Sequence, residues 1–241
     1  MKEIYDHYLE NTFGSYQPCK VKRAQFLFNY RRWFPQPGSG AKVLDIGPGR
    51  GEMLDVLAEC GVTDCTGVDL SEEIVRFCRS RGFVCEWTDD TEAFLLRHEN
   101  SCDLITVCDV LEHIDRNHTL PFLSAVRRAL KPGGKAIFQV PNMAAEDAAL
   151  YYYADFTHVA GFTELSLKQV LMTAGFSRCE LHDYEVFCYG GIKEAAARLL
   201  RPFFYAWTRF RRRVIGSHCP NIITPVFFAV AEKGSGHENS F

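Results

Sequence analysis

The chain has 241 residues, of which 47% are hydrophobic and 24% are charged, and its formal net charge is -3 at pH 7. This length supplies one full hydrophobic core or two small ones, and the composition excludes disordered and fibrous classes. The small negative charge gives no reason to expect nucleic acid as a partner. The polar N-terminus predicts no secretory signal, and no apolar run reaches the roughly 18 residues that span a bilayer.

The ten cysteines suggest buried apolar side chains rather than a disulfide or zinc framework. Several of them fall in or beside apolar segments, where free cysteine behaves as a small hydrophobic residue. The sequence has no C-x-x-C pair and no Cys/His cluster with zinc spacing. We therefore expect free thiols in a reducing cytoplasm.

Residues 1–40 form a leading segment in which aromatic residues recur at roughly helical intervals. A helix is expected over 21–33, and the Pro- and Gly-rich residues 35–40 end it. Two interpretations stay open for this segment. It is a helical cover packed on the edge of the sheet, which we favour, or a lid whose Tyr30 and Arg31 side chains touch the substrate.

From residue 41 onward, short apolar runs alternate with amphipathic runs. Strands are predicted at 42–46, 65–69, 83–87, 103–108 and 135–140, with helices between them at 51–60, 71–81, 91–98 and 120–130. Strands and helices that alternate at this spacing form a parallel sheet covered by helices on both faces. The predicted fold class is therefore α/β, a Rossmann-like, doubly wound domain over 41–232.

The C-terminal third departs from this regular pattern. Thr163 is the expected cap of a helix that ends at Gly175, and two more strands are predicted at 177–188 and 222–230. They complete a mostly parallel, seven-stranded sheet in which one strand near an edge runs antiparallel. Residues 233–241 are predicted to form a flexible tail.

Residues 191–215 are predicted to form a separate basic-amphipathic helix, which Pro202 is expected to break or kink. Three interpretations stay open. The default is a core-packing helix with a solvated basic face. The second is a peripheral contact at the inner membrane surface, where the helix docks a lipid-linked or anionic glycan. The third is a contact in a homodimer.

A glycine-rich turn follows the first strand, and the rest of the chain is organised around it. Its sequence is Asp45-Ile46-Gly47-Pro48-Gly49-Arg50-Gly51. Such a turn lets a ligand approach bare backbone at the start of a helix. The dinucleotide fingerprint G-x-G-x-x-G does not fit, because Glu52 stands where its third glycine belongs. An acidic residue there would also serve a pyrophosphate poorly.

Four features together resemble class I S-adenosylmethionine-dependent methyltransferases, over residues 42–185. The turn matches the D-x-G-x-G-x-G motif of that family, Asp69 ends the second strand, Asp89 and Asp90 follow the third, and L-x-P-G-G precedes the fifth. An acidic rim suits a ligand that carries a sulfonium and an ammonium but no phosphate. The resemblance implies S-adenosylmethionine as the cofactor and the following cofactor-binding residues: Asp45, Gly47, Pro48, Gly49, Gly51, Asp69, Leu70, Asp89, Asp90, Asp109 and Val110.

The fourth strand leads into Asp109-Val110-Leu111-Glu112-His113, at the edge where doubly wound sheets bind ligands. Similar D-V-L-E-H stretches occur in many small-molecule methyltransferases, and in ubiquinone-biosynthesis relatives the Glu-His pair is linked to metal binding. Two residues are too few to predict a metal here, so we expect none. His113 is expected beside the substrate, in a supporting rather than a catalytic part.

Residues 153–158, followed by 162–167, resemble the D-x-T-H … [FY]-T-x-x-S-L segment of methyltransferases found with glycan, O-antigen and surface-polysaccharide assembly enzymes. The segment follows the fifth strand and should overhang the ligand crevice. A histidine in such a loop can deprotonate a hydroxyl near neutral pH, so His158 is the candidate base, oriented by Asp155, with Tyr153 beside the substrate. The alternative is that Asp155 and His158 only shape the pocket.

We therefore expect in-line methyl transfer to an oxygen of a sugar or glycan intermediate. Two alternatives stay open: O- or C-methylation of a small aromatic or quinone-type molecule, and a cofactor-binding module without catalysis. A protein or nucleic-acid acceptor is not expected. The sequence after the fourth strand lacks an Asn-Pro catalytic tetrapeptide, and the basic residues concentrate in 191–215.

Overall fold

The structure is a computed structural model that describes residues 17–187 and 191–235. Within these residues, seven strands form one sheet in the order β3-β2-β1-β4-β5-β7-β6. The pairs among β1 to β5 are parallel, whereas β7 is antiparallel to both of its neighbours. The prediction of an α/β fold with a mostly parallel, seven-stranded sheet and one antiparallel strand near an edge is confirmed.

Most elements lie close to their predicted ranges. The strands are β1 (Lys42–Ile46), β2 (Asp64–Asp69), β3 (Val84–Trp87), β4 (Cys102–Cys108), β5 (Leu130–Pro141), β6 (Arg178–Asp183) and β7 (Val226–Glu232). The helices are α3 (Lys20–Tyr30), α4 (Glu52–Glu59), α5 (Glu72–Ser80), α6 (Thr91–Arg97), α7 (Arg116–Ala129), α8 (Ala148–Tyr153), α9 (Glu164–Thr173) and α10 (Gly191–Val214), with single 3-10 turns η1 (Arg31–Trp33) and η2 (Leu111–His113).

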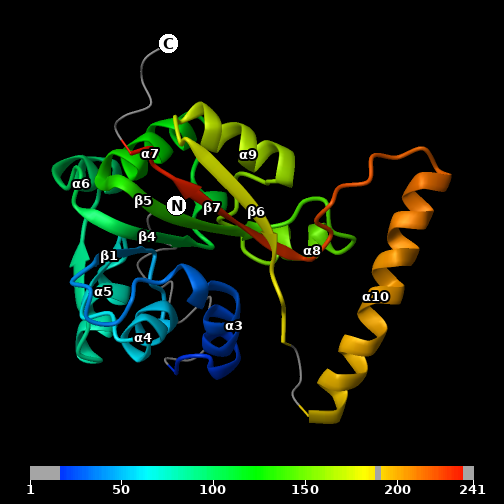
Figure 1. Ribbon diagram of the computed structural model, residues 1–241, viewed down its shortest axis with the longest axis horizontal. Coiled ribbons are helices and arrows are strands. Elements are labelled where there is room, and N and C mark those ends of the chain that lie inside the picture. The colour runs from blue at the N-terminus through cyan, green and yellow to red at the C-terminus, as the bar shows by residue number, and fades with distance from the viewer. Residues whose placement is uncertain (1–16, 188–190, 236–241) are drawn as a thin grey trace.

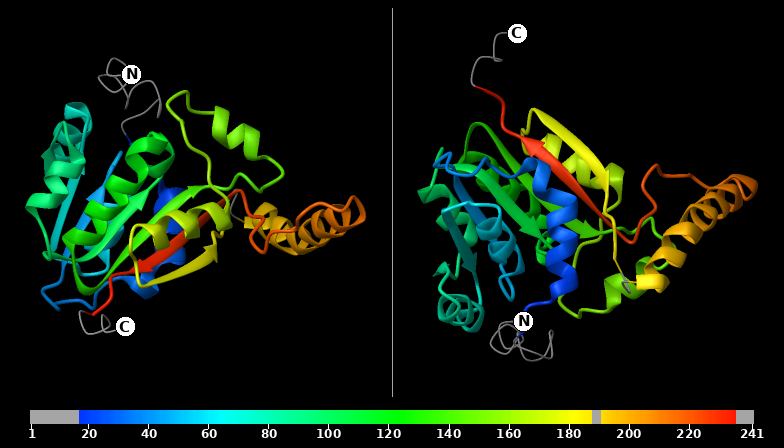
Figure 2. Two further views of the ribbon diagram at one scale, coloured as in Figure 1. Left: turned by 90° about the horizontal axis from the view of Figure 1, so that it is seen from above. Right: turned by 60° about the horizontal axis from the view of Figure 1, so that its bottom comes forward.

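Helices cover both faces of the sheet (Figures 1 and 2). Successive residues of β1 serve opposite faces, as the alternation of a strand requires. Val43 packs into one core cluster with residues of α3 and α4. Leu44 packs into a second cluster with residues of α6, α7 and α9. The two layers leave the carboxyl ends of β1, β2 and β4 side by side at one edge of the sheet.

Several boundaries differ from prediction, among them the end of β6 at Asp183 rather than at 188 and the start of β7 at Val226 rather than at 222. α7 begins at Arg116 rather than at 120, because Oδ1 of Asp115 accepts the Asn117 N–H at 2.9 Å and caps the helix. β5 begins at Leu130 rather than at 135, so the Pro-Gly-Gly run predicted to precede the strand lies inside it. The ladder between β4 and β5 is irregular at that point.

The termini of the predicted domain layout are described only in part. Residues 1–16 of the predicted cover, residue 188 of the predicted sixth strand and residues 236–241 of the predicted tail lie outside the described residues. In the described part, α3 packs on α4 and buries Phe26 and Tyr30 against the sheet. The cysteines of the described residues are all free.

Helix α10 differs most from expectation. It runs unbroken through Pro202, so the predicted break is absent. It stands beside the sheet rather than on it (Figure 1), and among its residues only Glu194 and Thr208 are buried. The core-packing interpretation is therefore wrong. None of the described helices, α10 included, is both long and apolar enough to cross a membrane.

Candidate active site

A cavity of about 730 Å³ opens at the carboxyl ends of the parallel strands. Asp45 near the end of β1, Asp69 at the end of β2 and Asp109 directly after β4 all line it. This edge is where doubly wound sheets bind ligands. Among the described residues of the lining, eight carry carboxylates and Lys22 is the one lysine. The other predicted residues on this lining are Gly47, Pro48, Gly49, Leu70, Asp89, Asp90, Val110, His113, Asp155 and His158.

The glycine turn lets the backbone pass close to the end of β4. Gly47 has φ +71°, and a Cβ there would lie 2.4 Å from Cγ2 of Val110. Its N–H donates to the Val68 carbonyl at 2.9 Å, which fixes the turn on β2. Glycine alone satisfies the positive φ and the close approach, so this wall of the cavity is bare backbone. Gly51, by contrast, forms the left-handed start of α4 beside Arg81 and is not among the lining residues.

Two carboxyls of the cavity, the buried Asp45 and the half-buried Asp69, accept hydrogen bonds from the protein. Oδ1 of Asp45 accepts a hydrogen bond from the Thr106 hydroxyl at 2.6 Å, whereas its Oδ2 is buried without a partner among the described residues. Oδ1 of Asp69 accepts the Ser71 N–H at 2.8 Å. Ser71, not Asp69, caps α5, because its hydroxyl accepts the Ile74 N–H. An unsatisfied carboxylate oxygen in an acidic cavity fits a cationic ligand that also carries hydroxyls.

Cofactor affinity should fall as the pH drops through 7. Burial raises the pKa of both Asp45 and Asp69 to about 7, so each carboxyl is increasingly protonated below that pH. A cationic ligand binds best to the ionised carboxyls, so protonation competes with binding. Below pH 7, affinity should therefore fall by up to about tenfold per pH unit for each carboxyl. Titration calorimetry with S-adenosylmethionine on either side of neutral pH measures this slope. A flat profile would contradict the ionisation assigned to these two groups.

The carboxylate of Asp109 is fixed by two side chains. The residue has φ +56°, an uncommon conformation outside glycine. Gln139 donates from Nε2 to its Oδ1 at 2.6 Å, and Lys22 donates from Nζ to its Oδ2 at 3.1 Å. The Tyr30 hydroxyl in turn donates to Oε1 of Gln139. Tyr30 is completely buried, with its ring edge-on to Phe228. It supports the site from the core, and the prediction that it touches substrate is wrong.

Replacing Tyr30 by Phe should lower the free energy of unfolding by about 1–3 kcal/mol, because it leaves Oε1 of Gln139 buried without this donor. The ring packing survives, so the variant should fold, and urea denaturation measures the loss. Tyr184→Phe is the matched control. Tyr184 lies in the same core cluster, but its hydroxyl is 3.5 Å from Oε1 of Gln25. Equal losses in the two variants would contradict the role given to Tyr30.

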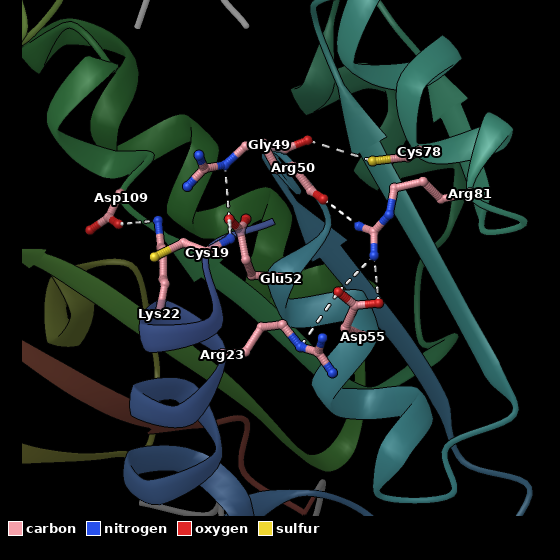
Figure 3. A network of polar contacts seen from close by, with 10 residues as sticks. All are labelled: Cys19, Lys22, Arg23, Gly49, Arg50, Glu52, Asp55, Cys78, Arg81 and Asp109. Carbon is pink, nitrogen blue, oxygen red and sulfur yellow. Dashed lines mark hydrogen bonds and ion pairs between the residues drawn. The ribbon is translucent and has the colours of Figure 1, made fainter. Parts of the chain in front are cut away.

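A network of polar contacts ties the N-terminal segment to the glycine turn (Figure 3). The Cys19 N–H and Nε of Arg50 both donate to Oε1 of Glu52 at 2.9 Å. Burial acts to lower the pKa of Lys22, but Asp109 and Glu52 outweigh it, so the pKa is raised and the ammonium stays charged. The sequence does not point to Lys22 as a site residue, because no local pattern signals a contact across 87 positions. α3 is therefore both a cover and a wall of the cavity.

At the rim of the cavity, Asp89 and Asp90 have different roles, which the sequence alone does not distinguish. Oδ1 of Asp90 accepts the Ala93 N–H at 2.9 Å and so caps α6. This leaves Asp89, exposed on the lining, as the better candidate to contact an adenine. Two predicted substrate residues are not among the lining residues: Arg31 is exposed in η1, and Tyr153 is 80% exposed at the end of α8.

His158 faces a buried carboxyl that sequence analysis left out of the candidate residues. Nδ1 of His158 lies 2.8 Å from the Tyr152 carbonyl, which can only accept, so in the neutral ring Nδ1 carries the proton and Nε2 the lone pair. Nε2 lies 4.0 Å from Oε1 of Glu112. Glu112 is 1% exposed, and neither of its oxygens has a hydrogen-bond partner among the described residues. Burial raises the pKa of Glu112 well above its usual value.

Asp155 orients the second histidine of the cavity rather than the first. Its Oδ1 accepts from the Thr157 hydroxyl at 2.6 Å and from the Thr157 N–H at 2.9 Å. The same hydroxyl lies 2.7 Å from Nδ1 of His113. Because the hydroxyl gives its proton to Asp155, Nδ1 of His113 is the donor to it. Burial lowers the pKa of His113, and the neighbouring His158 adds to this effect.

Glu112, His113 and His158 could also hold a metal ion. One ligand atom from each of the three lies within 4.8 Å of the others. A carboxylate with two imidazoles, each bonded through its other ring nitrogen, is a donor set that divalent transition metals accept. The sequence predicts no metal, since Glu112 and His113 alone are too few, but the loop after β5 supplies His158 as a third donor. The three side chains therefore fit a metal ion. That the protein uses no metal stays a prediction.

Comparison with known proteins identifies the family. A family model described as a methyltransferase domain matches residues 18–181. The ubiquinone biosynthesis O-methyltransferase of Thiobacillus denitrificans is 30% identical over 119 residues, which are 47% of this chain and 50% of the relative. That of Idiomarina loihiensis is 32% identical over 108 residues, 43% of each chain. The chain thus spans about half the length of these curated relatives.

Solved structures share the fold. A SAM-dependent methyltransferase from Archaeoglobus fulgidus superimposes with a TM-score of 0.69 at 22% identity, covering 95% of this chain and 99% of that one. One from Thermotoga maritima, described as a possible histamine N-methyltransferase, gives 0.64 at 17% identity, with 96% and 98% covered. The family model spans most of the chain, and the acidic, glycine-walled cavity fits the cofactor. The chain belongs to the methyltransferase domain family, and it shares its fold with solved SAM-dependent methyltransferases.

Proposed function

We propose that this methyltransferase methylates a hydroxyl oxygen of a small aromatic metabolite. The observation that carries the proposal is the His158–Glu112 pair, in which Nε2 of His158, a residue of the cavity lining, bears the lone pair. Apolar side chains share this lining, among them Val110, Ile114 and Phe122, and they suit an aromatic ring better than a sugar. The names of the relatives in Thiobacillus and Idiomarina support an oxygen acceptor on a small metabolite.

The cavity offers a separate group for each part of the cofactor. S-adenosylmethionine, when bound, supplies a methyl group on a sulfonium and the thioether that leaves. We assign Asp69 to the ribose hydroxyls and Asp89 to the adenine. The unpartnered oxygen of Asp45 suits the ammonium, and the Lys22 ammonium suits the carboxylate. The bare backbone at Gly47 lets the ligand lie against the turn.

His158 would act as the general base. Its Nε2 takes the proton of the acceptor hydroxyl, and the resulting imidazolium keeps its bond from Nδ1 to the Tyr152 carbonyl. The Glu112 carboxyl lies 4.0 Å from Nε2, where a carboxylate would compensate the new positive charge. Such a base typically adds about 10²–10⁴-fold to the rate, while the cavity supplies alignment and excludes water.

A sugar hydroxyl is the second candidate acceptor, because the segment from Asp155 to His158 resembles that of glycan-associated methyltransferases. Release of S-adenosylhomocysteine, measured with a panel of ortho-dihydroxy phenols and a panel of nucleotide sugars, separates the two. We expect turnover with phenols. Turnover with nucleotide sugars alone would overturn the aromatic acceptor. No turnover with either panel, from a protein shown to bind the cofactor, would count against both.

A further inference from the structure

Helix α10 turns its polar side to the protein and its apolar side to solvent. The residues that it presents to the body of the molecule recur every three or four positions and are buried or half-buried: Glu194, Ala197, Arg201, Tyr205, Thr208 and Arg212. All but Ala197 are polar. The opposite side carries large apolar side chains that are 51–90% exposed: Ile192, Leu199, Leu200, Phe203, Phe204, Trp207, Phe210 and Val214. A surface helix of a globular protein ordinarily has the reverse orientation.

Polar contacts hold α10 in this orientation. In its first half, Nη1 of Arg201 donates to Oε1 of Glu185, in the segment after β6, at 2.9 Å. In its last turn, Arg212 donates to the carbonyl of Ala144, in the loop after β5. Contacts at two places along the helix fix both its position and the direction that its apolar side faces. The exposed strip is therefore a defined surface of the molecule.

The strip is large and bordered by positive charge. A helix of 24 residues is about 36 Å long, far more than a scattered exposed residue would cover. Residues 191–215 carry seven basic side chains and one acidic side chain, in a chain whose net charge is -3. Lys193, Arg211 and Arg213 are exposed beside the apolar side chains. Apolar side chains between basic ones match the boundary between lipid tails and anionic headgroups.

We propose that α10 docks this methyltransferase on the surface of an anionic lipid bilayer. The helix lies parallel to the surface, with Phe203, Trp207 and Phe210 at the headgroup boundary and Lys193 and Arg213 among the lipid phosphates. A second copy of the chain is the competing occupant. Charge disfavours it, because two such helices placed face to face would bring their basic residues together. The proposal does not depend on which acceptor the enzyme methylates.

Vesicle flotation tests the proposal on the full chain. The protein should float with vesicles of mixed phosphatidylglycerol and phosphatidylcholine at low salt. It should float less with phosphatidylcholine alone, and less as salt screens the charges. Protein that stays at the bottom of the gradient with the anionic vesicles at low salt would overturn the proposal.

Matched variants locate the contact. Phe203→Ser with Phe210→Ser should abolish flotation, whereas Val84→Ser with Leu165→Ser should not. The control pair is as exposed, at 62% and 61%, but lies on β3 and α9. Circular dichroism establishes that both double variants are folded. Equal flotation of the two would overturn the proposal.

The charged border makes a separate prediction. Removal of Lys193 and Arg213, by substitution with Ala, should weaken binding to the anionic vesicles by about fivefold for each charge. The two side chains have no bonded partner among the described residues, so their loss should leave the fold unchanged. Binding that is as tight as in the wild-type protein would overturn the assignment of these residues to the lipid phosphates.

Tryptophan fluorescence tests the contact in the wild-type protein, without a variant that loses vesicle binding. Trp207 is 60% exposed on the apolar strip, so the emission of the wild-type protein should shift to the blue when anionic vesicles are added. Trp207→Phe should remove that shift while the protein still floats. Analytical ultracentrifugation without vesicles tests the competing occupant. A wild-type dimer that does not float, and that Phe203→Ser with Phe210→Ser converts to a monomer, would overturn the lipid contact in favour of a second copy.

Discussion

A His158→Ala variant should turn over about 10²–10⁴-fold more slowly than the wild-type enzyme with a hydroxyl acceptor, because the acceptor then has no base to take its proton. The Kd for S-adenosylmethionine should stay unchanged, since the residue is assigned to the acceptor and not to the cofactor. Steady-state kcat and titration calorimetry measure the two quantities. Unchanged turnover in a variant that binds the cofactor would remove His158 from the chemistry.

Two controls separate this role from others. His218→Ala, in the exposed loop after α10, should keep wild-type activity and so excludes a general effect of losing a histidine. Dialysis against EDTA should leave kcat unchanged if His158 acts as a base. A loss of activity that Mg²⁺, Mn²⁺ or Zn²⁺ restores would instead assign Glu112, His113 and His158 to a metal.

An Asp69→Asn variant should bind S-adenosylmethionine about ten- to a hundredfold more weakly, because a hydrogen bond to a charged carboxylate contributes about 1.5–3 kcal/mol. The amide still offers an oxygen to the Ser71 N–H, so the turn after β2 should persist. At saturating cofactor, kcat should stay close to that of the wild-type enzyme. The lost contact stabilises the bound ground state and the transition state equally, so its loss does not change the barrier between them. Calorimetry and saturation kinetics measure these effects.

Asp64→Asn is the control for this variant. Asp64 is the first residue of β2 and Asp69 is the last. Asp64 is exposed at the amino end of the strand, away from the cavity. Its substitution removes the same charge from the chain but should leave the Kd unchanged. Equal weakening by both substitutions would show that overall charge, rather than a contact with the cofactor, sets the affinity.

The elements that the sequence predicted well are those with local signals. β1 has its predicted bounds, because a short buried strand between a Pro- and Gly-rich breaker and a glycine turn is marked on both sides. Gly47 combines a positive φ with a close contact, and glycine spacing signals both. Asp69 lies where the next helix cap, Ser71, indicates that the strand has ended.

The features that the sequence did not predict depend on contacts across the fold. Glu112 lies in η2 after β4 and His158 in the loop after α8, so neither residue reveals the other. Asp89 and Asp90 differ only in which one caps α6, and that depends on backbone angles. The amphipathic pattern of α10 shows that two faces exist but not which one meets the protein. The usual assumption, apolar side inward, gave the wrong answer.

The place of β7 has a consequence for how the chain reaches this fold. β7 is the last strand along the described chain, yet it lies between β5 and β6. Until residues 226–232 have been synthesised, β6 lacks the strand with which it pairs and the edge of β5 stays open. Phe228 of β7 also packs on Tyr30 of α3, so the first described helix and the last described strand close one core together.

Folding of the nascent chain is therefore completed late, by contacts of high sequence separation. A fragment that ends where the family model ends, at residue 181, would retain every predicted cofactor-binding residue. It would still lack β7, and with it the packing that supports the hydrogen bonds from Tyr30 to Gln139 and from Gln139 to Asp109. Its open β5 edge would favour pairing with other chains over binding of the cofactor.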